Sequence, residues 1–68
     1  MKAAQRNTLI DKTRKPGTGA NAAVAAIVAE CLRLSDAGKL TAPDKAWLQD
    51  VVEHVPPARP YAEAALAK

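Results

Sequence analysis

Residues 20–37 read ANAAVAAIVAECLRLSDA and decide the fold, because the stretch has the periodicity of a long helix. Its larger apolar residues recur at helical spacing and define one stripe, made of Val24, Ile27, Val28, Cys31 and Leu34. Gly38 follows at once and suits the position after a helix, where a left-handed backbone is accessible to glycine. We therefore expect a helix over residues 20–37.

The opposite face of this predicted helix is only partly polar. Glu30, Arg33 and Asp36 occupy its C-terminal half, and alanines fill the remainder. A helix that is nearly apolar around its first half is covered on more than one side. Because alanine is small, another helix can approach this one closely.

A second helix is predicted over residues 41–55. Thr41 can cap its start, and Asp44 three residues later completes a shortened capping box. Its inward stripe consists of Leu48, Val51, Val52 and Val55. Pro56 and Pro57 end the helix, since a proline disfavours the helical conformation in the residue before it.

The short connection over residues 38–40 predicts that the two helices are antiparallel neighbours. Residues 20–55 are thus expected to form a helical hairpin. Residues 56–68 follow as a stiff proline-rich spacer and a short third helix over residues 61–67. We expect this last helix to dock on the hairpin or on a second subunit, because burial of its apolar residues is favourable.

The first 19 residues differ in chemistry from the rest. Residues 1–15 carry five cations and one acid, whereas the remaining chain is nearly neutral. A proline and two glycines then follow between residues 16 and 19, which breaks any regular element. We therefore interpret residues 1–19 as a flexible basic arm with a Gly/Pro linker.

The size of the chain limits its core. A domain of 68 residues rarely gains more than ~3–5 kcal/mol from its core without disulfides, metals or a second subunit. Cys31 is the only cysteine, so no intrachain disulfide can form. These observations predict an all-α fold completed by dimerisation.

An unpaired cysteine also fits a reducing compartment, and no run reaches the ~20 apolar residues of a membrane span, so the expected location is the cytoplasm.

The sequence offers no catalytic group. Cys31 lies in an apolar stripe, where burial makes a thiol inert, and His54 is interpreted as a solvated residue near a helix end. Asp50 and Glu53 fall on a polar helix face and are interpreted as solvated as well. One cysteine and one histidine cannot form a zinc quartet. We therefore predict a protein that is not an enzyme and has no metal, cofactor or small-molecule substrate.

Two kinds of partner remain. The thin core and the surplus of apolar helix surface favour a small regulator or inhibitor that binds another protein, of a kind common in phages and mobile elements. The residues predicted to bind that protein are Trp47, Val51, His54 and Tyr61. The alternative is a DNA- or RNA-binding regulator, in which the cations of the arm neutralise phosphates. Its predicted contacts are Lys2, Arg6, Lys12, Arg14 and Lys15. A solvated, partly disordered terminus is the favoured explanation of the same cations, and contact with an acidic protein surface is a further one.

The order of a basic arm, a helix, a glycine turn and a second helix is superficially similar to that of ribbon–helix–helix repressors. In that family an N-terminal strand enters the DNA major groove, and the comparable residues are Arg6, Thr8, Ile10 and Lys12. The other face of such a strand would bring Asp11 to the core, and a long break precedes the first helix. We therefore do not assign the chain to this family.

Overall fold

The computed structural model of the protein describes residues 3–15 and 19–67, which contain four α-helices and no strand. The helices are α1 (Ala3–Arg14), α2 (Ala20–Ala37), α3 (Ala42–His54) and α4 (Arg59–Leu66). A short 3-10 helix, η1 (Pro56–Ala58), connects α3 to α4. The predicted all-α fold is confirmed.

The N-terminal segment differs from the prediction. Residues 3–14 form α1, so the prediction of a flexible arm is wrong for them. The inward side of α1 repeats at i, i+3, i+4 and i+7, through Arg6, Leu9, Ile10 and Thr13, which are buried or half-buried. Because two of these four residues are polar, the inward side is not uniformly apolar. The spacing of the apolar residues alone therefore does not indicate a helix in this charged segment. The predicted Gly/Pro linker falls mainly on residues 16–18, which lie outside the described residues.

Helices α2 and α3 begin and end close to where the sequence predicts. Gly38 terminates α2 with a φ of 76°, a left-handed backbone that glycine adopts readily. At the start of α3 the Asp44 backbone N–H donates to Thr41 Oγ1 at 3.3 Å. The Thr41 backbone N–H donates in return to Asp44 Oδ2 at 3.1 Å. The predicted capping box is therefore confirmed.

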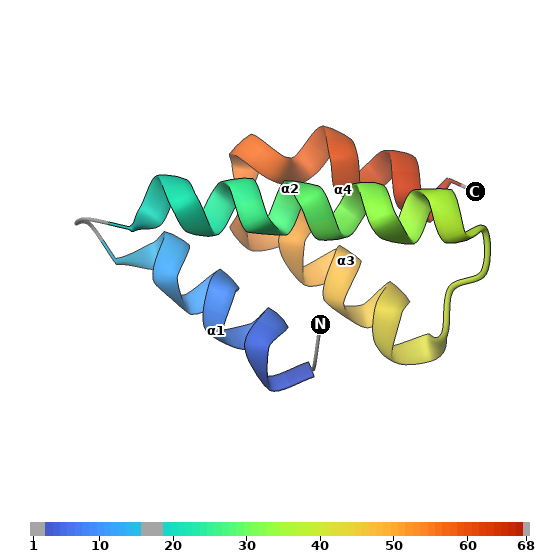
Figure 1. Ribbon diagram of the computed structural model, residues 1–68, viewed down its shortest axis with the longest axis horizontal. Coiled ribbons are helices and arrows are strands. Elements are labelled where there is room, and N and C mark those ends of the chain that lie inside the picture. The colour runs from blue at the N-terminus through green and yellow to red at the C-terminus, as the bar shows by residue number, and fades with distance from the viewer. Residues whose placement is uncertain (1–2, 16–18, 68) are drawn as a thin grey trace.

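The C-terminal segment is helical almost throughout. Pro56 and Pro57 belong to η1, so the prediction of an extended spacer is wrong. The short turn leads directly into α4, which packs on both α2 and α3, as Figure 1 shows. Three small residues on the inner side are fully buried, namely Ala58, Ala62 and Ala65. The expectation that this last helix docks on the rest of the chain is confirmed.

The packing of the helices differs from a simple hairpin. In Figure 1, α2 crosses the front of the molecule, with α1 and α3 on one side of it and α4 on the other. α2 packs mainly on α1 and α4, and α3 packs mainly on α4, whereas α2 and α3 meet over only a short stretch. The predicted antiparallel pairing of residues 20–37 with residues 41–55 is therefore not confirmed. The helices form a body of 34 × 22 × 17 Å.

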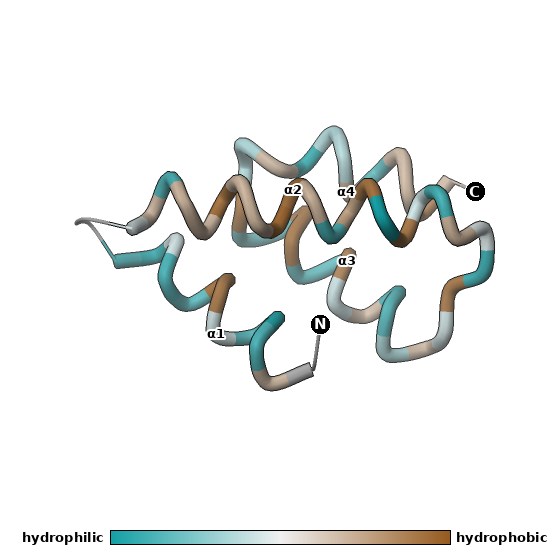
Figure 2. The backbone as a smooth tube through the Cα atoms, viewed as in Figure 1, coloured by the Kyte–Doolittle hydropathy of each residue, from teal (hydrophilic) through white to brown (hydrophobic). Residues whose placement is uncertain are grey.

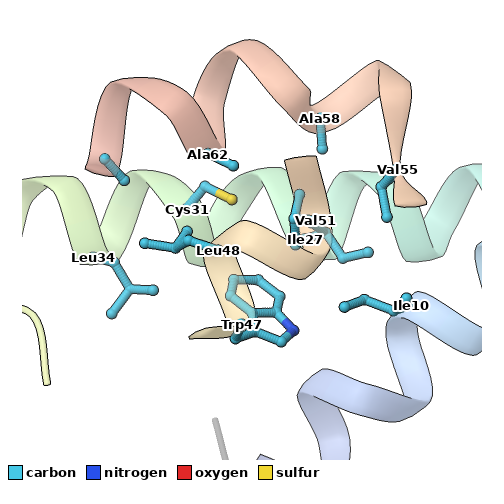
Figure 3. Close-up of a cluster of buried hydrophobic side chains, with 11 residues drawn as sticks. Ile10, Ile27, Cys31, Leu34, Trp47, Leu48, Val51, Val55, Ala58 and Ala62 are labelled. Atoms are coloured by element: carbon cyan, nitrogen blue, oxygen red, sulfur yellow. The ribbon is translucent and has the colours of Figure 1, made fainter. Parts of the chain in front are cut away.

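The core lies between α2, α3 and α4 and is closed on one side by α1. Its largest fully buried side chains are Ile27, Cys31, Leu48, Val51 and Val55. Figure 3 shows η1 and α4 above this cluster, where Ala58 of η1 and Ala62 of α4 allow the backbone to approach closely. Because these side chains are buried by one chain, the monomer completes its own core.

Within residues 3–15 and 19–67, none of the helices combines the length and the apolar character required to cross a membrane.

Candidate functional site

Two of the residues predicted to bind a partner lie inside the molecule. Trp47 is 4% exposed and Val51 is fully buried, and both belong to the hydrophobic core. Val51 is therefore inaccessible to a partner, and Trp47 presents only a small edge to a surface cleft. The remaining two predicted residues, His54 and Tyr61, are exposed, but they come from different helices, α3 and α4.

Arg6 links three helices through a buried ion-pair network. Its Nη1 lies 2.7 Å from Asp44 Oδ1 on α3, and its Nη2 lies 3.0 Å from Glu30 Oε2 on α2. Arg33 binds the same Glu30 carboxylate from the solvent side, with an Nε–Oε1 distance of 2.7 Å. Glu30 was expected on a polar face and is instead 4% exposed. The network fixes α1 against the rest of the protein.

The electrostatics of this network favour the charged forms of both acids. Hydrogen bonding by the Arg33 side chain holds the pKa of Glu30 below its usual value, although burial acts in the opposite direction. The Thr41 backbone N–H lowers the pKa of Asp44, and the Arg6 guanidinium lowers it further. Both carboxylates therefore remain ionised throughout the neutral and mildly acidic range.

Trp47 forms the apolar side of the same cluster. The Arg6 Cζ atom lies 5.4 Å from the centroid of the Trp47 ring, a distance at which cation–π attraction operates. The indole Nε1 points toward α1 in Figure 3, and within the described part of the chain it has no hydrogen-bond acceptor. An unpaired buried N–H is unfavourable by ~1–3 kcal/mol, so it offsets part of the stabilisation gained by burying the Trp47 ring.

The cations assigned to nucleic-acid binding separate into two groups. Arg6 is buried and occupied by two carboxylates, so it is unavailable to phosphates. Lys12, Arg14 and Lys15 are exposed at the C-terminal end of α1. Lys2 lies outside the described residues.

One arrangement of side chains approaches a metal site. Asp50, Glu53 and His54 each offer a ligand atom, and these atoms lie within 4.8 Å of one another on α3. His54 Nε2 is 3.8 Å from Glu53 Oε2. All three residues are exposed on a single helix, and Arg14 lines the cleft beside Asp50 and His54. Asp11 lines the same cleft, so its carboxylate and the Arg14 guanidinium act on a cation in opposite directions. Three exposed side chains on one helix do not by themselves form a metal site.

Cys31 provides no reactive thiol. Its side chain is fully buried beneath α4, as Figure 3 shows. Burial raises the pKa of the Cys31 thiol to about 11, with a smaller contribution from the nearby Glu30 carboxylate. The thiolate that acts as a nucleophile is thus nearly absent at neutral pH.

An uncovered, mainly apolar surface lies on α2, where Leu32 is an exposed large hydrophobic residue. Residues at helical spacing along its solvent side form a continuous strip, which we name the α2 outer face: Asn21, Ala22, Ala25, Val28, Ala29, Leu32 and Asp36. Val28 is half-buried and the others are exposed. Figure 2 shows hydrophobic residues along much of α2, and Leu32 leaves 50% of its surface in solvent. This face is mainly apolar between two polar ends.

A groove lies on the α1 side of α2, where Ala26 is the α2 residue among those that line it. It lies between α1 and α2, has a volume of about 410 Å³, and is lined by residues that include Leu9, Ala26 and Lys12. The groove widens the apolar surface from α2 toward α1. Together, the groove and the α2 outer face are the strongest candidate for a binding surface on the described part of the protein.

The sequence contains a signal for this surface that the prediction of binding residues missed. Leu32 follows the stripe residue Cys31 by one position, so it points about 100° away from the stripe. A large apolar residue outside the core stripe marks a second apolar face.

Comparison of the chain with protein-family models, with curated proteins and with solved structures finds no match.

Proposed function

We propose that this protein is a small non-enzymatic regulator or inhibitor that acts by binding protein through the α2 outer face. The observation that carries the proposal is the half-exposed Leu32 among the mostly small apolar residues of the α2 outer face. Large apolar side chains surrounded by small residues are suited to insertion into a partner's hydrophobic surface. This proposal replaces Trp47 and Val51 as contact residues, because both are buried.

Affinity capture from native extract tests the proposal. The bait is the wild-type chain, and the test variant is Leu32→Glu, which places a charge in the apolar face. The matched control is Gln49→Glu, which introduces the same charge at an exposed position of α3. We expect a protein that wild type and Gln49→Glu retain and Leu32→Glu loses, with direct binding reproduced from purified components. Equal capture by all three baits contradicts the proposal.

Nucleic-acid binding is a second candidate function, supported by one observation. Lys12, Arg14 and Lys15 are exposed within four positions, and Asp11 is the only acid in the first 15 residues of the sequence, although Asp50 of α3 lines a cleft with Arg14. Three phosphate contacts predict a slope of about −2.7 for the logarithm of affinity against that of salt concentration.

The test variant for this second candidate replaces Lys12, Arg14 and Lys15 with glutamine. Removal of residues 1–15 is a poor test, because it also deletes Arg6 and Ile10, which pack on the remaining helices. We expect the triple variant to fold normally and to lose duplex binding at low salt. Unchanged binding by the triple variant, or none by wild type, contradicts this candidate.

A further inference from the structure

The α2 outer face extends along most of an 18-residue helix. Its exposed positions recur every three or four residues, which is the spacing of one helix side. Leu32 and Val28 are its larger apolar members, whereas Ala22, Ala25 and Ala29 are small. Small residues let a second helix approach to the short end of the usual 8–10 Å interaxial range.

The face is complementary to itself when two copies of α2 run antiparallel. A two-fold axis between residues 28 and 29 places Leu32 of one copy opposite Ala25 of the other. The same operation places Val28 opposite Ala29. The two central kinds of contact, Leu32 with Ala25 and Val28 with Ala29, therefore each pair a larger side chain with a small one, so the two surfaces can interlock there.

The polar ends of the face select the antiparallel direction. In that arrangement Asp36 of one copy meets Asn21 of the other, and an amide N–H can donate to a carboxylate. Asp36 also approaches the N-terminal end of the other α2, where the helix dipole favours negative charge. A parallel arrangement would instead bring two Asp36 carboxylates together and leave Ala25 opposite Ala25.

We propose that the α2 outer face binds a second copy of this chain, as a two-fold antiparallel α2–α2 pair. This inference rests on the proposed function, since it names the partner of the same surface. One helix pair with its flanking grooves forms a small interface, and interfaces below ~1,200 Å² are weak and transient. We therefore expect a dimer with a Kd of roughly micromolar order.

Sedimentation velocity over a concentration series tests the dimer. Wild type and the Gln49→Glu control should change from monomer to dimer with rising concentration. Leu32→Glu should raise the dimer Kd about 100-fold, because it places two unpaired charges in the interface. Circular dichroism and Trp47 fluorescence identify any loss of folding. A wild-type chain that stays monomeric at roughly 100-fold above the expected Kd overturns the inference.

A mixing experiment tests the register. Ala25→Lys and Leu32→Glu should each dimerise poorly alone. Mixed, they should form a heterodimer in which the introduced lysine of one chain faces the introduced glutamate of the other. The second contact across the axis is then an unaltered pair of Ala25 and Leu32. Mixing Leu32→Glu with Ala25→Glu is the matched control: each chain should dimerise poorly alone, and the mixture should not restore association because two glutamates then face each other. If the heterodimer fails to form while wild type dimerises, the proposed register is wrong.

The two proposals can fail separately. If the wild-type chain is monomeric and its capture of another protein depends on Leu32, the proposed dimer is wrong and the proposed function is supported. If Leu32→Glu breaks the dimer but leaves the capture of a different protein unaffected, the α2–α2 pair is supported. The α2 outer face is then not the surface that binds the different protein.

Discussion

Arg6 illustrates how one charged residue can organise a fold. Taken as one cation among five, it belongs to a solvated arm. In the structure it is 8% exposed, contacts two carboxylates and lies over the Trp47 ring. A sequence pattern cannot reveal this role, because the partner acids lie 24 and 38 positions away along the chain.

Replacement of Arg6 tests its structural role. Arg6→Met should lower the free energy of unfolding by about 2–3 kcal/mol, since loss of one partner leaves buried carboxylate charge with fewer compensating donors. Arg33 still binds Glu30, which limits the effect. Urea unfolding followed by circular dichroism measures the change. Arg14→Met, at an exposed position of the same helix, should alter stability by less than about 0.5 kcal/mol.

Cys31 should be unreactive in the folded protein. Its thiol is buried and has a pKa of about 11, so little thiolate is present at pH 8 and reagents cannot reach it. We expect labelling by a thiol-specific disulfide reagent to follow unfolding, with fast modification in urea and slow modification in buffer. Rapid labelling of the native protein would show that α4 opens readily above Cys31.

At the scale of elements, α2 and α3 could be predicted because their signals are local. The stripe of α2, Gly38 after it and the capping box of α3 all lie within a few residues of the feature that they specify. α1 could not be assigned from its charge, since its inward stripe contains Arg6 and Thr13. The packing of the elements also escaped prediction, because α1 and α4 together cover the sides of α2 that a hairpin would leave open.

The stability of the fold should depend on pH in a defined direction. The pKa values of Glu30 and Asp44 are lowered in the folded state, so their stabilising contribution is present above their unfolded values of about 4. It is lost as the pH falls through the lower, folded values. Unfolding free energy, measured in urea by Trp47 fluorescence, should be nearly constant between about pH 7 and 5 and should fall below about pH 4.

The Arg6→Met variant is the control for this pH dependence. It lacks one of the cations that lower both pKa values, so its stability should fall less between about pH 5 and 3 than that of wild type. Equal losses in the two proteins would show that other acids cause the acid sensitivity.

At the scale of the molecule, the main difference from the prediction is how the chain covers its core. Dimerisation was expected because 68 residues with two aromatic rings are few for closing a core within one chain. Four helices achieve this closure by using alanine where α4 meets α2 and α3. A dimer is therefore not needed to cover the core. The surface that a second chain would cover is instead the α2 outer face. Leu32, which marks that face, is visible in the sequence only as a residue outside the stripe.

Close packing of α4 should make its buried alanines sensitive to enlargement. Ala62→Leu adds three carbon atoms at a fully buried position and should lower the unfolding free energy by about 1–3 kcal/mol, because α4 must move away from α2 and α3. Ala64→Leu makes the same change at an exposed position of the same helix and should be nearly neutral. Thermal unfolding of the two variants, with amide exchange across α4, measures the difference. If both variants match wild type in stability and in α4 protection, α4 does not pack on the core as described.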